Sequence, residues 1–292
     1  MDRDWGIIIV LGIGWGTTFF FNELLLKDLG PLSVAFARIS MAALSSWIYL
    51  LVIRQSGRIP IKEALPLLFL GACMFALPFS LFPIGQQYVA TGVAGIVNAL
   101  TPVMVVVISH LWPGGERATP LKTLGVAAGF IGIVLLTIPA FQSDQETKVF
   151  GTLIMVIAPV SYAVGLNWVR RFTDIKTSVA VTWSFTFAAI MLLPLVAMTE
   201  GKPGPIQPIT WGAIVIMGSV LTGLFFQVGF ALLPRMGATK TSSVTFIAPV
   251  SALLIGWWAL GERLEIVHFA GMAAIFLGLF LIDGRLFRRK FN

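Results

Sequence analysis

The chain has 292 residues, of which 57% are hydrophobic and only 11% are charged, and its net charge is +7. Soluble domains carry about 25% charged residues, so this composition excludes most soluble classes. Many apolar runs of about 20 residues can each cross a bilayer, and only a helix satisfies their backbone groups in lipid. The alternation typical of outer-membrane strands is absent from the sequence. The sequence therefore predicts an all-α integral membrane protein.

Apolar runs bounded by glycine, proline and charged residues predict ten transmembrane helices. Their ranges are 5–26, 33–53, 64–84, 88–112, 121–141, 150–169, 178–198, 211–233, 239–260 and 267–284. The third and fourth are the least clearly divided, because residues 65–112 contain no charged side chain. Only Pro83, Gly85, Gln86 and Gln87 offer a turn between them.

The distribution of basic residues predicts the orientation of these helices. If the N-terminus is cytoplasmic, 15 of the 20 Lys and Arg residues lie on the cytoplasmic side and one, Arg38, lies inside a span. The other face receives only Lys27, Lys148, Lys202 and Arg263. Because basic residues concentrate in cytoplasmic loops, both termini are expected in the cytoplasm. The same rule accounts for the positive net charge without a nucleic-acid partner.

One series of residues occurs twice in the chain. The first copy contains Pro102, Glu116-Arg117, Gly125 and Gly132, and the second contains Pro249, Glu262-Arg263, Gly271 and Gly278. The prolines stand 147 residues apart (249 − 102) and the glutamates 146 (262 − 116), which is half of the chain. Such an echo indicates an internal duplication. We therefore expect one five-helix repeat in residues 1–142 and a second in residues 143–292, packed as one transmembrane body.

Five helices are an odd number, so the two copies must enter the membrane from opposite sides. Inverted repeats are typical of secondary transporters, in which one half rocks against the other around a site at the midplane.

The duplicated motifs also resemble those of a known family. An apolar helix containing Thr101-Pro102-Val103 or Ala248-Pro249-Val250, followed by Gly-Glu-Arg and a glycine-rich helix, is similar to the drug/metabolite transporter superfamily. Trp15-Gly16-Thr17 and Arg38 fit the same pattern, although the first loop has an extra residue before Glu116. The resemblance is strongest to the ten-helix metabolite exporters of the bacterial inner membrane. It implies export of amino acids, including aromatic ones.

Several residues within the predicted spans are candidates for substrate binding. Arg38 could hold a substrate carboxylate bidentately or instead tie helix ends together. Aromatic and polar side chains at similar depths could form the rest of a pocket, although buried aromatics more often serve packing. These candidates are Trp15, Tyr162, Trp183, Asn98, Thr101, Ser161, Gln227 and Thr245.

Pro102 and Pro249 interrupt helical hydrogen bonding at equivalent places in the two copies. They are candidates for paired hinges, and the alternative is a pair of fixed kinks.

No constellation for catalysis or metal binding is present in the sequence. All Asp and Glu residues fall in loops or at helix ends, which disfavours cationic substrates and a carboxylate proton relay. His110 and His268 stand alone, and Cys73 is the only cysteine. The sequence therefore predicts no enzyme, no cofactor, no metal and no disulfide.

Alternatives remain open at this stage. A transporter of anionic metabolites, such as sugar phosphates or nucleotide sugars, would need more cations facing its cavity than Arg38 alone. A membrane protein that transports nothing is a second alternative, against which the repeat argues. Both a monomer and a homodimer are compatible with the sequence.

The orientation can be tested by cysteine labelling. Cysteines introduced after Lys148 or Gly201 should react with impermeant reagents added outside, whereas cysteines beside Ser56 or Lys176 should not, because the basic loops are expected inside. The reverse pattern would invert the predicted topology.

Overall fold

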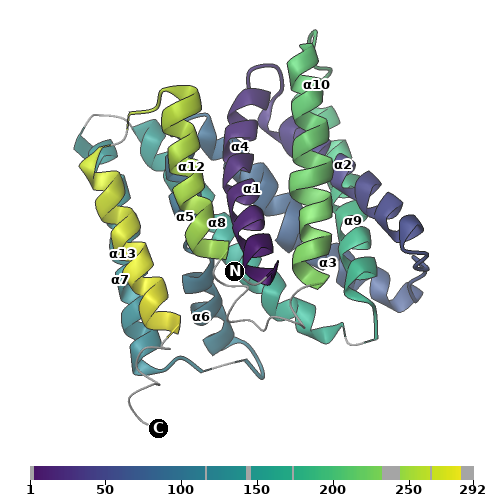
Figure 1. Cartoon of the computed structure of the whole chain (residues 1–292), viewed down its shortest axis with the longest axis horizontal. Coiled ribbons are helices and arrows are strands. Elements are labelled where there is room, and N and C mark those ends of the chain that lie inside the picture. The colour runs from purple at the N-terminus through teal and green to yellow at the C-terminus, as the bar shows by residue number, and fades with distance from the viewer. Residues whose placement is uncertain are drawn as a thin grey trace.

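The computed structural model describes residues 3–115, 117–142, 146–172, 174–231, 244–263 and 265–283. These residues form ten helical segments and no strand (Figure 1). Six of the segments are long and apolar enough to cross a membrane, and three more are shorter apolar helices. Many large hydrophobic side chains, such as Leu51 and Trp258, point outward, as they do in a protein whose solvent is lipid.

The first half of the chain contributes the first five segments. Their elements are α1 (Arg3–Leu25); α2 (Pro31–Val52); η1 (Ile61–Glu63), α3 (Ala64–Gly71), η2 (Ala72–Ala76) and α4 (Leu77–Gln86); α5 (Thr91–Asn98) and α6 (Thr101–Leu111); and α7 (Pro120–Gln142). The third and fourth spans therefore divide between Gln86 and Thr91. Pro83 and Gly85, which the sequence offered as turn residues, lie within α4.

The second half contributes the other five. Its elements are α8 (Glu146–Trp168) with η3 (Val169–Arg171); α9 (Thr177–Thr199); α10 (Pro208–Val215) with η4 (Ile216–Leu224) and a helical continuation to Ala231; α12 (Val244–Leu260); and α13 (Ile266–Asp283). Each predicted span thus corresponds to an observed helix, and the predicted start of the ninth, residues 239–243, lies outside the described residues.

The segments run side by side and alternate in direction. In Figure 1, α1 begins and α13 ends at the lower face of the molecule, which is called the terminal face below. The opposite face carries the end of α1 and the start of α10.

The third and eighth spans share a departure from regular α-helix. Each contains a π-helical stretch, η2 in the third and η4 in the eighth. In the third span Pro78 has no N–H, so the carbonyl of Cys73 loses its i+5 donor, and the hydroxyl of Ser161 donates to that carbonyl at 2.8 Å. In the eighth span the hydroxyl of Thr222 donates to the carbonyl of Met217 at 2.7 Å. Both π-helical stretches therefore carry a hydroxyl bond to a backbone carbonyl, and at Cys73 the hydroxyl replaces a backbone donor that proline lacks.

Helix packing follows a repeated pattern. α1 packs along α12, while α8 packs along α5 and α6. In the same way α2 packs against η4, while α9 packs against α3 and η2. α7 packs along α13 at one edge of the body (Figure 1).

Glycines allow the close approach of α7 and α13. A Cβ atom at Gly125 would lie 2.6 Å from the carbonyl oxygen of Gly278, and one at Gly132 would lie 2.8 Å from that of Gly271. The glycines at these repeated positions therefore serve helix packing.

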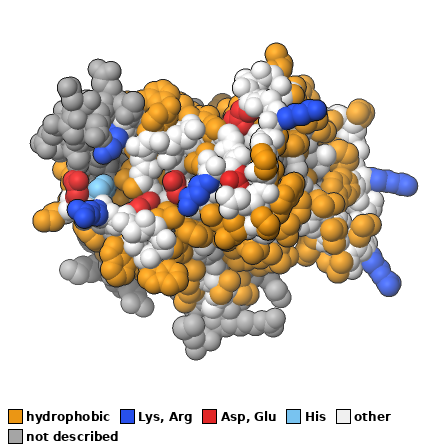
Figure 2. All heavy atoms as spheres, turned by 90° about the horizontal axis from the view of Figure 1, so that it is seen from above, with side chains coloured by type: hydrophobic (Ala, Val, Ile, Leu, Met, Phe, Trp, Pro, Cys, Tyr) orange, Lys and Arg blue, Asp and Glu red, His pale blue; other side chains and the backbone are white. Residues whose placement is uncertain are grey.

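Three carboxylates on the opposite face join the two halves of the chain. Glu262 accepts the backbone N–H groups of Thr91 at 2.6 Å and Gly92 at 3.1 Å, at the start of α5. Glu200 does the same for Leu32 and Ser33 at the start of α2. Figure 2 looks onto this face, where acidic side chains lie within a rim of hydrophobic ones.

Asp28 accepts the hydroxyl of Thr210 and the backbone N–H of Gln207, at the start of α10. These bonds lower the pKa of Asp28, the Thr210 hydroxyl contributing most. Each carboxylate thus satisfies orphan donors at a helix N-terminus, where negative charge is also favoured by the helix dipole.

This capping can be measured. Replacement of Glu262 with Ala should lower the free energy of unfolding by about 1 kcal/mol, the usual cost of losing a cap, with a corresponding fall in the melting temperature in detergent. Glu265→Gln, which removes an exposed carboxylate three residues away, is the matched control. Equal melting temperatures for the two variants would show that the cap adds no stability.

Candidate functional site

Arg38 is buried in the first half of α2, with only 5% of its surface exposed. Its guanidinium lies over the ring of Phe79 of α4, with the central carbon 3.7 Å from the ring centroid. Its Nε atom donates a hydrogen bond to the hydroxyl of Thr222, 2.8 Å away in η4. The guanidinium is therefore held in a fixed plane by three spans drawn from both halves of the chain.

The π-helical stretch positions Thr222. Its hydroxyl donates to the carbonyl of Met217, five residues earlier, which leaves the oxygen free to accept from Arg38. No sequence pattern pointed to this residue, since the hydroxyl of a threonine in an apolar span usually bonds only to its own helix.

Arg38 has no acidic partner among the described residues. Its one other electrostatic neighbour is the hydroxyl of Tyr162 in α8. The terminal nitrogens of the guanidinium make no hydrogen bond to a described residue. A buried cation with open donors and no carboxylate can accept an anionic group from a ligand.

The ring of Phe79 beneath this cation belongs to a larger aromatic cluster. Phe226 lies at the centre of the cluster, with its ring centroid 5.2 Å from those of both Trp15 and Phe75 and 6.3 Å from that of Phe79. Phe75 in turn stacks on Phe185 at 3.9 Å. The rings come from α1, η2, α4, α9 and the eighth span, so the cluster joins both halves. Of these rings, only Trp15 was singled out from the sequence, because one phenylalanine among 23 carries no distinguishing signal.

Two buried polar atoms beside the cluster lack partners. The indole N–H of Trp15 has no acceptor among the described residues. Gln227 donates to the carbonyl of Ser178 and the hydroxyl of Thr182, and its own carbonyl oxygen has no donor. A buried polar group without a partner is costly, so both are candidates to meet a ligand or water.

The remaining predicted residues have structural contacts that the sequence did not reveal. Tyr162 packs against two hydrophobic clusters, one around Phe75 and Phe185 and one around Leu100. The hydroxyl of Ser161 donates its hydrogen bond to the carbonyl of Cys73.

Trp183 packs at the edge of the hydrophobic cluster that contains Phe75 and Phe185. Its indole N–H donates to the carbonyl of Gly57, in the segment between α2 and α3, and its ring meets that of Trp47.

Asn98 and Thr101 lie at the break between α5 and α6, beside the cluster around Leu100. The side chain of Thr245 lies outside the described residues.

The two candidate hinges differ in structure. At Pro102 the fourth span is interrupted, since α5 ends at Asn98 and α6 begins at Thr101. Pro102 cannot donate to the carbonyl of Asn98, and the hydroxyl of Thr101 does so instead at 2.8 Å. Pro249 lies inside the continuous helix α12. Their role as hinges stays a prediction.

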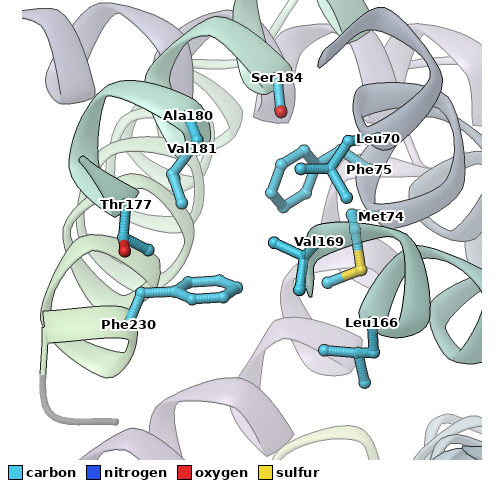
Figure 3. Close-up of a pocket in the computed structure, with 10 residues that line it drawn as sticks. All are labelled: Leu70, Met74, Phe75, Leu166, Val169, Thr177, Ala180, Val181, Ser184 and Phe230. Atoms are coloured by element: carbon cyan, nitrogen blue, oxygen red, sulfur yellow. The ribbon is translucent and has the colours of Figure 1, made fainter. Parts of the chain in front are cut away.

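A narrow cavity borders the ring cluster where α8 ends and α9 begins (Figure 3). Phe75 and Phe230 point into it from opposite sides, with Ser184 and Thr177 at its margin. Its volume is about 20 Å³, enough for one water molecule. The described conformation is therefore closed around the cluster.

A wider hollow of about 350 Å³ opens between the ends of α6 and α8, beside Trp112 and Arg171.

No group of three or more His, Cys, Asp or Glu side chains that could hold a metal ion occurs among the described residues.

These features define a multi-pass helical membrane protein in which one cation buried among the described residues and an aromatic cluster lie where the two halves meet. The model of the EamA-like transporter family matches residues 5–138 and again residues 149–283. The chain therefore belongs to the EamA-like transporter family of the drug/metabolite transporter superfamily, and it is a membrane transporter.

Relatives of similar length support this assignment. The uncharacterized transporter YoaV of Bacillus subtilis is 27% identical over 98% of each chain. The uncharacterized inner membrane transporter YedA of Escherichia coli is 23% identical over 95% of this chain and 89% of its own length. One solved crystal structure matches 94% of this chain and 95% of its own with a TM-score of 0.69 at 19% identity, which shows a shared fold.

The prolines can be tested as hinges by substitution. Replacing Pro102 or Pro249 with Ala should slow transport by about tenfold while substrate binding in one state survives, because a hinge absorbs motion without touching the ligand. Flux and equilibrium binding would be measured on the same reconstituted variants. A double Ala variant with unchanged flux would identify both prolines as ordinary kinks.

Proposed function

We propose that this protein is an inner-membrane secondary transporter that exports small neutral or zwitterionic metabolites carrying a carboxylate. Amino acids, including aromatic ones, are the foremost candidates. The observation that carries the proposal is the lone guanidinium of Arg38, buried without an acidic partner beside an aromatic cluster. A carboxylate on an apolar body complements both features of this site.

Transport would proceed by alternating access of two inverted five-helix repeats, residues 1–142 and 143–292. The packing pattern supports this, since α1–α12 contacts correspond to α8–α5 contacts when each span is exchanged with the one five places away. The π-helical stretches occur in the third and eighth spans, which are equivalent under the same exchange. The family model also matches each half separately.

The terminal face is proposed to be cytoplasmic. In the described part of the chain, the loops on this face carry Arg54, Arg58, Lys62, Arg117, Lys122, Arg171 and Lys176. The opposite face carries Lys27, Lys148, Lys202 and Arg263. The excess of basic residues favours the cytoplasm for the terminal face.

Sugar phosphates and nucleotide sugars fit the site less well. Each brings two or more negative charges, and Arg38 is the one basic side chain buried among the described residues. The uncompensated charges would have to be buried in an aromatic environment, which is costly.

Counterflow in proteoliposomes with a panel of labelled amino acids tests the proposal. Affinities near millimolar, about 4 kcal/mol of binding, are expected because an exporter must release its substrate. Replacing Trp15 or Tyr162 with Ala should lower the flux of Phe and Trp about two- to tenfold, the range expected for one aromatic contact, and affect Ala and Thr less.

Two outcomes would contradict the proposal. Faster transport of arginine or a cationic dye than of any neutral amino acid would exclude the substrate class. An equal loss of all substrates in both variants would make Trp15 and Tyr162 packing residues.

A further inference from the structure

The charges around Arg38 discriminate between ligands that share a carboxylate. Arg38 is the one positive charge of the site, and the site offers no negative charge among the described residues. Asp28, Glu200 and Glu262 lie at the opposite face, and their carboxylates are already engaged by helix N-termini. An amino acid bound at Arg38 would therefore bring an ammonium group with no counter-charge.

The site therefore stabilises the carboxylate of an amino acid but not its ammonium group. Its carboxylate would gain charge-assisted hydrogen bonds from the open nitrogens of a guanidinium that Phe79 and Thr222 already hold in place. Its ammonium would lose hydration beside the rings of Phe226, Phe75 and Trp15, and among the described residues only neutral acceptors such as the Gln227 carbonyl could compensate. Removal of the amine removes this cost and leaves the attraction to Arg38 intact.

The apolar part of the ligand would meet the rings around Phe226 when the cluster opens. Phe226 contacts the rings of Trp15, Phe75, Phe79, Phe185 and Phe230, so a flat apolar group inserted there gains several ring neighbours at once. The indole N–H of Trp15, buried without an acceptor, would favour a further acceptor atom on the ligand over a further donor.

We infer that the preferred ligands of this site are amine-free monocarboxylates with an aromatic or branched apolar body, and that amino acids are weaker ligands of the same site. This inference rests on the proposed transport function, and it ranks monoanions above the zwitterions named there as ligands of the same site. A single guanidinium matches a single carboxylate, which sets the expected charge of the ligand at −1.

Three compounds with the same ring test the inference. 3-Phenylpropionate carries only the carboxylate, phenylalanine carries carboxylate and ammonium, and phenethylamine carries only the ammonium. Binding to the purified protein in detergent would be measured by calorimetry at pH 7, and each compound would compete for counterflow in proteoliposomes. 3-Phenylpropionate should bind about tenfold or more tightly than phenylalanine, and phenethylamine should not compete.

Variants of Arg38 link the ranking to the guanidinium. Arg38→Gln should abolish the preference for 3-phenylpropionate. Arg38→Lys should keep the order of the three compounds at lower affinity, because lysine keeps the positive charge but cannot bind a carboxylate bidentately. Arg171→Gln removes an exposed guanidinium stacked on Trp168 and is the matched control, which should leave the ranking unchanged. If Arg38→Gln does not fold, the ranking by the native protein still decides the question.

The outcomes separate the two proposals. Phenylalanine binding as tightly as 3-phenylpropionate would overturn the inference and leave the proposed transport of amino acids in place. Failure of the folded native protein to bind or exchange any of the three compounds, or of the amino-acid panel, would overturn both.

Discussion

A hydrocarbon environment supplies no hydrogen-bond partners, and this constraint governs every irregular feature of the structure. Where Pro102 removes a backbone donor, the hydroxyl of Thr101 takes its place. Where Pro78 removes another, Ser161 reaches across from α8 to the Cys73 carbonyl. These hydroxyls would look like ligand-binding groups in a list of buried polar residues. Their hydrogen bonds show that they already donate to backbone carbonyls left without a partner at the prolines.

The same constraint makes Arg38 exceptional. Thr222 and Phe79 hold the guanidinium but supply no negative charge, and its terminal nitrogens stay open. Replacement of such a group by an apolar residue often stabilises a protein. A buried cation without an anionic partner is therefore not explained by its contribution to the free energy of folding. Its place in a transporter is better explained by the ligand, whose carboxylate would complete the pair during the transport cycle.

The fold could be predicted from the sequence to a large extent, and the site only in part. Apolar runs and charged loops located ten helices because lipid forces long, uniform segments with charges at their ends. Arg38 was detectable because a charge inside a span is rare. Phe226 and Thr222 could not be detected in the sequence. Phe226 matters through contacts with distant helices, and Thr222 is positioned by a π-helical stretch that no local sequence pattern predicts. Trp183 shows what a span pattern leaves out, because its indole N–H donates to the carbonyl of Gly57, a contact between distant segments.

The cross-links between the two halves explain how such a body could open without losing its fold. Glu200, Glu262 and Asp28 join the halves at the opposite face through backbone N–H groups that stand at the membrane surface. When these bonds break, water can hydrate both partners, so each costs only about 1 kcal/mol net. Apart from the hydrogen bond from Arg38 to Thr222, the ring cluster below is held by apolar contacts, which can slide as helices move. The carboxylate bonds between the halves thus lie where water can replace them, whereas Arg38, the one charged side chain buried among the described residues, lies where water does not reach it.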